Sequence, residues 1–579
     1  MKAEQEILEQ AQLWLDSPID EESKAEIRKM MASEDQSELI DAFYKDMEFG
    51  TGGLRGIMGV GSNRLNIYTL GMATQGLSNY LLKSFPNQQV KVAISYDSRL
   101  NSKYFAQKVA DVFTANGIKV YFSDKVRPTP MVSYAIRHFG CQSGVMLTAS
   151  HNPKEYNGYK AYWEDGAQVV APHDKNIIGE VQKISSISEI KFEGNPKLLH
   201  IIEDSFDRSY LAEIMNLKEN PELVSRHSGM AIVYSPIHGT TGEIIPKALK
   251  SYGFENVHVV EEQRLPDGNF PTVVSPNPEE AAAMDMAIKL AEKVSAHIVL
   301  ASDPDGDRVG VAAMGKSGKY ELLNGNQTAA LLTWYLLRNL HDKGKKKGNE
   351  FVVRTIVTTD LVEKIANFFN VKCYQTLTGF KYIAQLIREK EGKEQFIGGG
   401  EESYGYMVGD FVRDKDAISA CVLLAEIGAW TKARDLTLFD LLDQLHLRNG
   451  FYKEALISIT KKGKSGEEEI QTIMKKLRDN MPSEILGKKV VRVMDVLTGA
   501  DKDLINNTTS TLALEPSNVL QFFLEDGSKI SARPSGTEPK IKFYISVHMP
   551  FLSQADYNEV NGKLIERIDK LKAFLESFS

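Results

Sequence analysis

A serine and a histidine follow an apolar segment in the run Thr148-Ala149-Ser150-His151-Asn152-Pro153. The residues before it, Val145-Met146-Leu147, predict a strand, and ligands of open α/β sheets bind beyond the carboxyl ends of strands. A bare hydroxyl is a poor nucleophile, but it becomes useful when neighbours activate it or when it carries a group such as phosphate. Ser150 is therefore a candidate phosphate carrier. The alternative is a turn in which Ser150 caps a helix.

Three aspartates alternate in Ser302-Asp303-Pro304-Asp305-Gly306-Asp307-Arg308, directly after a predicted strand that ends at Leu300. Alternate residues of an extended or tightly turned backbone project to one side, so these carboxylates can converge. Without a cation they would repel one another. Oxygen-only ligation that leaves room for a phosphate oxygen suits Mg²⁺. The spacing therefore favours a magnesium site over an aspartate-rich turn.

A further loop, Gly398-Gly399-Gly400-Glu401-Glu402-Ser403-Tyr404-Gly405, also follows a predicted strand. Its glycines let the backbone approach a ligand, and Glu401 and Ser403 can point together at vicinal sugar hydroxyls. Downstream, Arg413 and Lys415 can add cations for a phosphate, or their segment can simply cap a helix.

Two more segments carry an arginine among glycines and hydroxyls. The run Arg533-Pro534-Ser535-Gly536-Thr537-Glu538-Pro539-Lys540 offers the parts of a phosphate nest, with a plain hairpin loop as the alternative. Gly50-Thr51-Gly52-Gly53-Leu54-Arg55-Gly56 places Arg55 in what we interpret as a flexible glycine loop.

One nucleotide-binding pattern is a false match. Residues 310–317 match the P-loop sequence pattern. Phosphate binding by a P-loop, however, needs a strand, a glycine loop and then a helix. Here the middle positions are apolar and strand-like, and Gly315-Lys316-Ser317-Gly318 predicts a hairpin turn. We therefore reject a P-loop.

Composition sets limits on the class of protein. The 579 residues, 42% hydrophobic and 25% charged, are typical of a globular protein with three to five domains. A net charge of -8 provides no basic field for nucleic acid or an anionic membrane. The polar N-terminus lacks a signal-peptide core, and no apolar run reaches membrane-spanning length, so we expect a cytoplasmic protein.

The chain alternates predicted strands and helices between residues 91 and 397, in three similar α/β units. Before them, residues 4–15 and 22–31 predict packing helices. After Asn449-Gly450 the pattern changes to strands with a closing helix over 554–578, which predicts a separate α+β domain. Within it, residues 461–466 predict a solvated loop.

The loops that contain Arg55, Ser150, the three aspartates, Glu401 and Arg533 together resemble those of the α-D-phosphohexomutase superfamily. The resemblance extends over nearly the whole chain. The motifs around Arg55 and Glu401 are similar to those of its phosphoglucomutase branch, which includes phosphopentomutase-like members. The resemblance implies a four-domain fold around a central cleft: three α/β domains and a C-terminal α+β domain related to the TATA-box-binding-protein fold. We expect the domains at 1–205, 206–323, 324–450 and 451–579.

The resemblance also implies roles for individual residues. Ser150 would be the phosphoserine, and its phosphate would share one Mg²⁺ per chain with the three aspartates. The expected catalytic residues are Ser150, His151, Lys160, Arg55 and Arg308. The expected substrate-binding residues are Thr378, Gly379, Glu401, Ser403, Arg413, Lys415, Arg533, Ser535, Gly536 and Thr537. The general base is left open between Lys160 and His151.

The implied activity is the reversible conversion of glucose 1-phosphate and glucose 6-phosphate, with glucose 1,6-bisphosphate as activator and intermediate. Family members with a phosphomannomutase-like sugar loop carry a histidine where Gly405 stands, which argues against dual use of mannose. Alternatives are phosphopentomutase or phosphomannomutase activity, a phosphatase, and a non-catalytic sugar-phosphate-binding protein. The expected partners are small sugar phosphates, with the chain a monomer or dimer.

Overall fold

The computed structural model describes residues 4–48, 53–461, 463–535 and 540–577. Contacts within the chain divide it into two compact units. Unit 1 comprises Met1–Gly325, Phe380–Gly398 and Ser403–Asp435, and unit 2 comprises Asn326–Gly379, Gly399–Glu402 and Leu436–Ser579.

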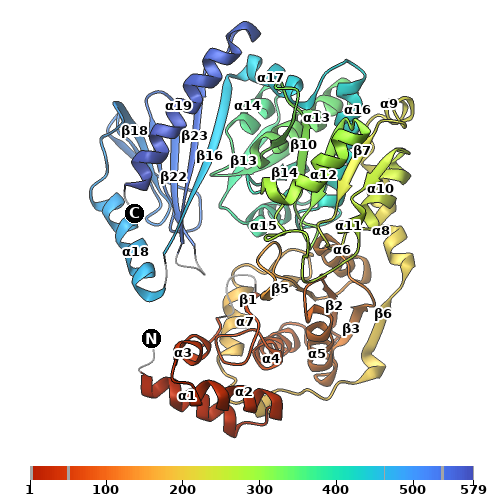
Figure 1. Cartoon of the computed structure of the whole chain (residues 1–579), viewed down its shortest axis with the longest axis vertical. Coiled ribbons are helices and arrows are strands. Elements are labelled where there is room, and N and C mark those ends of the chain that lie inside the picture. Colours follow the sequence, from red (N-terminus) through yellow and green to blue (C-terminus); the bar gives the residue numbers. More distant parts are fainter. Residues whose placement is uncertain (1–3, 49–52, 462, 536–539, 578–579) are drawn as a thin grey trace. The chain divides into compact units, whose positions relative to one another are not determined.

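The first part of unit 1 contains a six-stranded sheet in the order β1-β5-β4-β2-β3-β6 (Figure 1). β2 is parallel to β3 and β4, and β3 to β6, whereas β5 is antiparallel to β1 and β4. The strands are β1 (Gly53–Ile57), β2 (Lys91–Tyr96), β3 (Lys119–Ser123), β4 (Ser143–Leu147), β5 (Tyr156–Trp163) and β6 (Leu199–Ile202). The helices are α1 (Glu4–Asp16), α2 (Glu21–Ala32), α3 (Ser37–Phe43), α4 (Ile67–Ser84), α5 (Ser102–Ala115), α6 (Thr129–Phe139) and α7 (His173–Val181), with short 3₁₀ turns at Ile187–Glu189 and Pro196–Leu198.

Local sequence explains these elements. β4 is buried throughout, as expected for a strand inside a sheet that is covered on both faces. α5 carries Phe105, Val109 and Phe113 at four-residue intervals, and all three are buried. Asn66 begins α4 with a reciprocal capping box to Thr69. Loops extend from the ends of the strands of this sheet.

A second sheet of unit 1 has the order β11-β10-β9-β7-β8. β7 is parallel to β8 and β9, and β10 is antiparallel to both β9 and β11. The strands are β7 (Ile232–Ser235), β8 (Val257–Val259), β9 (Ile298–Ser302), β10 (Val309–Met314) and β11 (Tyr320–Leu323). The helices are α8 (Asp204–Asn216), α9 (Pro221–Arg226), α10 (Ile244–Tyr252), α11 (Glu261–Arg264) and α12 (Ala281–Val294).

The middle of the chain continues the α/β alternation. In unit 2, β12 (Glu350–Thr355) and β13 (Lys372–Thr376) are parallel and joined by α14 (Leu361–Phe368). The remaining elements of this region are α13 (Gly325–Asp342), α15 (Phe380–Lys390), β14 (Gln395–Gly400), β15 (Tyr406–Val408), α16 (Ala417–Lys432) and α17 (Leu438–Asn449).

The C-terminal part of unit 2 is built on an eight-stranded sheet in the order β16-β23-β22-β21-β18-β19-β20, with β17 beside β18. The strands are β16 (Phe451–Thr460), β17 (Glu484–Ile485), β18 (Lys488–Asp495), β19 (Ala500–Asp503), β20 (Thr508–Thr511), β21 (Leu520–Leu524), β22 (Lys529–Pro534) and β23 (Lys540–Met549). α18 (Gly463–Asp479), a 3₁₀ turn at Gln554–Asp556 and α19 (Tyr557–Glu576) complete it, and α19 packs against β16 and β23 (Figure 1).

Several sequence predictions are confirmed here, and one is wrong. Residues 310–317 are not a P-loop: β10 and β11 pair as an antiparallel hairpin across the predicted turn. The helices over 4–15 and 22–31 and the closing helix of the C-terminal part are present. The solvated loop predicted at 461–466 is wrong, because α18 begins at Gly463. The apolar residues of α18, Ile470, Ile473, Met474 and Leu477, are buried in the C-terminal core.

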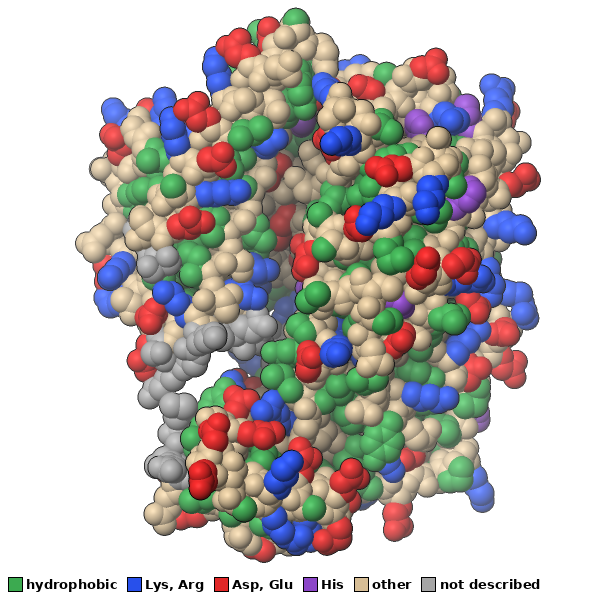
Figure 2. Space-filling model, in the orientation of Figure 1, with side chains coloured by type: hydrophobic (Ala, Val, Ile, Leu, Met, Phe, Trp, Pro, Cys, Tyr) green, Lys and Arg blue, Asp and Glu red, His purple; other side chains and the backbone are tan. Residues whose placement is uncertain are grey.

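Charged side chains of both signs are intermingled over the face shown in Figure 2. This agrees with the small net charge of the chain. No helix among the described residues is long and apolar enough to span a bilayer.

Glu454 on β16 is a half-buried residue whose carboxyl oxygen Oε1 is buried, and it has a testable effect on stability. Burial raises the pKa of Glu454 from about 4.5 to about 7, and its Oε1 has no hydrogen-bond partner. Between these two pH values the folded chain keeps a proton that the unfolded chain loses, so this residue lowers stability as pH rises. We expect Glu454→Gln to raise the Tm at pH 8, and the gain to shrink as pH falls toward 4.5.

Thermal melts at several pH values measure this effect. Glu484→Gln, at an exposed position of the same domain, is the control and should not change the pH dependence. A Tm at pH 8 lower for Glu454→Gln than for the parent chain would contradict the assignment.

Candidate active site

Ser150 lies in a tight loop beyond the carboxyl end of β4. Its backbone has φ = 53°, a left-handed conformation that is costly for residues other than glycine and is often found at functional sites. Thr148 Oγ1 accepts the Ser150 N–H at 2.8 Å. The chain then turns into β5 rather than a helix, so the helix-cap alternative is wrong.

The Ser150 hydroxyl is buried between two functional groups. It donates to Asp303 Oδ2 at 2.9 Å, and His151 Nδ1 lies 3.1 Å from its oxygen. Burial, followed by the charges of Arg308 and Arg55, holds the pKa of His151 well below its usual value. The imidazole is therefore neutral and can exchange a proton with Ser150 Oγ.

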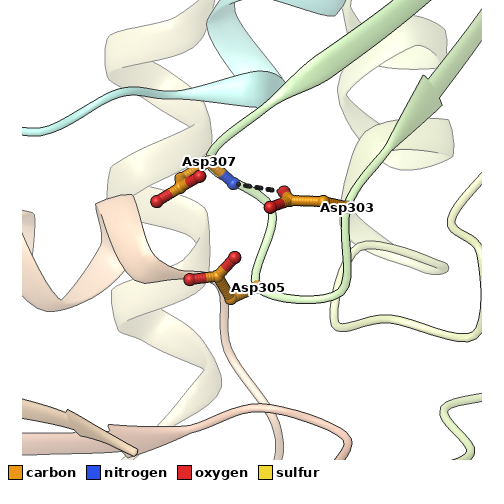
Figure 3. Close-up of side chains that lie close together, drawn as sticks. All are labelled: Asp303, Asp305 and Asp307. Carbon is orange, nitrogen blue, oxygen red and sulfur yellow. Dashed lines mark hydrogen bonds between the residues drawn. The ribbon is translucent and has the colours of Figure 1, made fainter. Parts of the chain in front are cut away.

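The three aspartates lie together in the loop between β9 and β10 (Figure 3). One carboxylate oxygen from each lies within 4.8 Å of the other two, and all three residues are buried. Asp303 Oδ1 accepts the backbone N–H groups of Asp307 and Arg308, at 3.1 and 3.0 Å. Gly306, with φ = 67°, allows the sharp turn that folds the loop back on itself.

Two lysines from other elements neutralise this acidic loop. Lys160 on β5 binds Asp305 Oδ2 at 2.7 Å and Asp307 Oδ2 at 3.0 Å. Lys415 binds Asp307 Oδ2 at 3.2 Å. Burial would raise the pKa of Asp305, but the Lys160 ammonium outweighs it and holds that pKa below its usual range.

The loop fits a hard divalent cation. Burial and the charges of the other two aspartates raise the pKa of Asp303 well above its usual value. The buried Oδ1 atoms of Asp305 and Asp307 have no hydrogen-bond partner. A cation bound by all three carboxylates would relieve both conditions, and oxygen ligands of this kind suit Mg²⁺.

Arg55 and Arg308 both lie close enough to His151 for their charges to lower its pKa. Arg55 lies on β1, opposite Gly158 of β5, so the flexible loop predicted for it is wrong. Its Nη1 donates weakly to Asn152 Oδ1 at 3.4 Å. Arg308 follows the third aspartate, and its Nη1 binds Glu279 Oε1 at 2.6 Å.

The sequence of the segment that contains Arg413 and Lys415 allowed two interpretations, a helix cap and a source of cations for a phosphate. Its structure has features of both. Asp416 caps α16 by accepting the Ile418 and Ser419 N–H groups. Lys415 reaches Asp307, as described above, and Asp414 Oδ1 at 3.2 Å. Arg413 is itself buried, and its guanidinium instead binds the backbone carbonyl of Asp410 and the carboxylate of Glu391, both exposed residues.

Unit 2 holds most of the expected sugar and phosphate groups. Two of these expected substrate-binding residues are in contact, because the Gly379 N–H donates to Glu401 Oε1 at 2.7 Å. The neighbouring Thr378 is buried. Glu402 accepts the hydroxyls of Thr355 and Thr358, and burial together with the Glu401 charge raises its pKa to about 7.

The expected phosphate nest lies where β22 and β23 form a hairpin. Arg533 is on β22, and the Ser535 N–H donates to Lys540 O at 2.7 Å. Gly536 and Thr537 lie outside the described residues. Ser403 belongs to unit 1 and is half-buried.

Sequence reasoning missed several residues that hold these loops. Thr129 Oγ1 donates to Asp305 Oδ2, Glu279 holds Arg308, and Asp414 holds Lys415. Arg99 binds the Ser150 loop through its guanidinium. The sequence pointed to this contact only through the charged run Asp97-Ser98-Arg99 after β2. That run does not identify its partner, because Arg99 and Ser150 are about fifty residues apart in the chain.

Gly405 gives a prediction about Lys415. A Cβ at position 405 would lie 2.1 Å from Lys415 Cδ, so only glycine leaves the path that Lys415 takes to Asp307. Gly405→Ala should therefore displace Lys415, and kcat/KM should fall by about the same factor as in Lys415→Ala. The double variant should be no worse than either single variant.

Steady-state kinetics on the three variants measure this coupling. Gly179→Ala in α7 is the control, since an added Cβ meets nothing within 4 Å there. Independent, multiplying losses in the double variant would show that Gly405 acts in another way.

Comparison with known proteins identifies the family of this chain. Family models described as phosphoglucomutase/phosphomannomutase, alpha/beta/alpha domains I, II and III, match residues 46–188, 208–316 and 324–446. A phosphoglucomutase of Staphylococcus haemolyticus is 37% identical over 530 residues, covering 90% of this chain and 94% of that protein. A phosphoglucomutase of Staphylococcus aureus is 36% identical over 524 residues, covering 90% and 93%.

Two solved structures share the fold. The phosphoprotein pp63/parafusin of Paramecium superposes with a TM-score of 0.67 at 18% identity, covering 92% of this chain and 96% of that one. A phosphoglucomutase/phosphomannomutase family protein of Burkholderia thailandensis gives 0.63 at 18% identity, covering 91% and 97%. The three α/β domains and the C-terminal sheet domain expected from the sequence are thus confirmed.

Proposed function

We propose that this chain, which belongs to the phosphoglucomutase/phosphomannomutase family, interconverts glucose 1-phosphate and glucose 6-phosphate. The observation that carries the proposal is the Ser150 hydroxyl, buried 2.9 Å from Asp303 Oδ2 beside two other carboxylates. A serine in that place can hold a phosphate whose charge a cation neutralises. The relatives named phosphoglucomutase support glucose as the sugar.

In this proposal the phosphate moves in two transfers. A sugar hydroxyl oxygen attacks the phosphorus on Ser150 Oγ, the bond to Oγ breaks, and the sugar becomes glucose 1,6-bisphosphate. The bisphosphate reverses its orientation, and Ser150 Oγ takes the other phosphate. Each transfer moves a proton from the attacking hydroxyl and returns one to the leaving oxygen.

The chain's own groups suit these steps. His151 Nδ1 lies within reach of the Ser150 Oγ proton, whereas the Lys160 ammonium is engaged by Asp305 and Asp307. This geometry favours His151 as the group that transfers the proton at Ser150 Oγ. Lys160 would then neutralise the negative charge of the aspartates and of the transferring phosphate. Mg²⁺ held by the three aspartates would supply further charge neutralisation for the transferring phosphate. Arg55 and Arg308 would stabilise the same group.

The proposal includes the substrate groups and the setting expected from the sequence. Glu401 and Ser403 would bind sugar hydroxyls, and Thr378 and Gly379 would line the same site. Arg413, Lys415, Arg533, Ser535, Gly536 and Thr537 would hold phosphate. We also propose domains at 1–205, 206–323, 324–450 and 451–579, a cytoplasmic location, and a monomer or dimer.

Rates with glucose 1-phosphate, mannose 1-phosphate and ribose 1-phosphate test the choice of sugar. We expect glucose to have the highest kcat/KM, with mannose lower by about tenfold to a hundredfold, because a mismatched hydroxyl leaves a polar group unpaired. Ribose is excluded less strongly, since a smaller sugar enters without a clash. Highest kcat/KM with ribose would contradict the glucose assignment, and phosphate release to water without mutase turnover would identify a phosphatase.

A further inference from the structure

Arg99 is a buried arginine whose guanidinium faces the backbone of the Ser150 loop. It lies three residues after β2, and its side chain is fully buried. Nη2 donates to the carbonyl oxygens of Ser150, at 2.7 Å, and of Asn152. Nη1 donates to those of Pro153, at 2.8 Å, and Tyr156, at 3.1 Å. All four terminal N–H groups therefore bind one seven-residue segment.

Asp97 holds the other side of this arginine. Its Oδ2 lies 3.4 Å from Arg99 Nε, and its Oδ1 accepts the Arg99 N–H and the Ser102 hydroxyl. The Asp97 N–H donates to Leu147 O, at the end of β4. Asp97 and Arg99 thus connect the end of the strand to the loop that follows it.

The chemistry of the contact requires a guanidinium. A buried charge is costly unless it is paired and hydrogen-bonded. The Asp97 carboxylate pairs with this guanidinium, and four carbonyl oxygens accept its terminal N–H groups, whereas Nε has no hydrogen-bond partner. Arginine offers five N–H groups in a rigid plane, whereas the lysine ammonium offers three around one atom. Arg99 Cζ also lies 5.2 Å from the centre of the Phe270 ring, within cation–π distance.

Ser150 depends on this arrangement for its conformation. Its left-handed backbone costs energy on its own, and the surrounding contacts must hold it in place. Thr148 fixes the N–H of Ser150, and Arg99 fixes its carbonyl oxygen. Between these two anchors, the side chain is directed at Asp303.

We propose that Arg99 is a positioning residue that holds Ser150 Oγ in line for phosphoryl transfer. The inference rests on the proposed role of Ser150 as phosphate carrier. Arg99 would not touch the sugar phosphate, so its loss should slow the transfer step without weakening substrate binding. A displacement of about 1 Å in a reacting group can reduce rate by about a hundredfold.

Arg99→Lys and Arg99→Gln test this inference against Arg127→Lys. Arg127 is equally buried in the same domain, but its guanidinium binds Ser123, Asp124, Asp207 and Ile202. We expect all three variants to lower Tm. Only the Arg99 variants should lower kcat, by about tenfold to a hundredfold, with Arg99→Gln the worse of the two and KM changed by less than about threefold.

A single-turnover measurement separates positioning from general destabilisation. The rate at which glucose 1,6-bisphosphate phosphorylates Ser150 should fall in the Arg99 variants by the same factor as kcat. Equal loss of kcat in Arg127→Lys, or a rise in KM that accounts for the whole effect, would overturn the inference.

Two further variants keep the result interpretable. If the Arg99 variants do not fold, Asp97→Asn keeps the guanidinium but weakens its anchor, and a lower kcat at constant KM is again expected. An unchanged kcat in folded Asp97→Asn would then overturn the inference. Mutase activity retained in Ser150→Ala would instead refute the role of Ser150 as phosphate carrier, and absence of mutase activity in the parent chain would refute the proposed function, so these failures are distinguishable from failure of the inference.

Discussion

Ser150→Ala should lower mutase turnover by more than about a thousandfold, because removal of a nucleophile that carries the transferred group abolishes the covalent route. The substitution removes only one oxygen, which donates to Asp303 and lies beside His151. The fold should therefore persist, with a Tm close to that of the parent chain. Coupled assays of glucose 6-phosphate formation measure the loss.

Ser95→Ala is the matched control for this experiment. Ser95 is a buried serine of the same domain, and its hydroxyl binds Ser123 Oγ and Arg127 O. We expect it to keep turnover near the parent level. Turnover retained in Ser150→Ala would show that phosphate passes by another route.

Asp305→Asn should lower turnover by about a hundredfold or more, because it removes one of the three charges that hold the cation and one partner of Lys160. Asparagine has the same size, so packing around the loop should change little. EDTA should lower the activity of the parent chain to a similar extent, and added Mg²⁺ should restore it.

Asp174→Asn, in α7, is the control for loss of a buried aspartate elsewhere in unit 1. It should leave both turnover and the Mg²⁺ dependence unchanged. Parent activity that is indifferent to EDTA, together with full activity in Asp305→Asn, would remove the metal assignment.

Strand-to-loop patterns were enough to locate the main chemical groups. Ser150 and Asp303 each follow an apolar strand by a few residues, and both lie at strand ends in the structure. The resemblance to the α-D-phosphohexomutase superfamily is confirmed by the family models. The positions of Ser150 and Asp303 could be predicted because each depends only on the few residues before it in the chain.

Features that depend on distant pairing were not predictable. Arg55 was assigned to a loop because of its glycines, but Gly53 and Gly158 instead let β1 and β5 pack closely: an added Cβ at Gly53 would lie 1.6 Å from Tyr159 O. Lys160 and Asp305 are 145 residues apart, and no periodicity in the sequence links them. The contacts of Arg99 were missed for the same reason.

The start of α18 was missed for a different physical reason. The basic and glycine-containing run at 461–466 is typical of exposed loops, but the helix draws its stability from apolar residues further along. Tertiary packing thus overrode the local preference at its first turn.

Peptide mass spectrometry of Ser150 tests the proposed phosphoserine most directly. After incubation with glucose 1,6-bisphosphate, the peptide that contains Ser150 should gain one phosphate, and subsequent glucose 6-phosphate should remove it as the bisphosphate forms. The account predicts that this exchange is at least as fast as turnover. An active enzyme whose Ser150 never carries phosphate, or exchanges it more slowly than it turns over, would contradict the account.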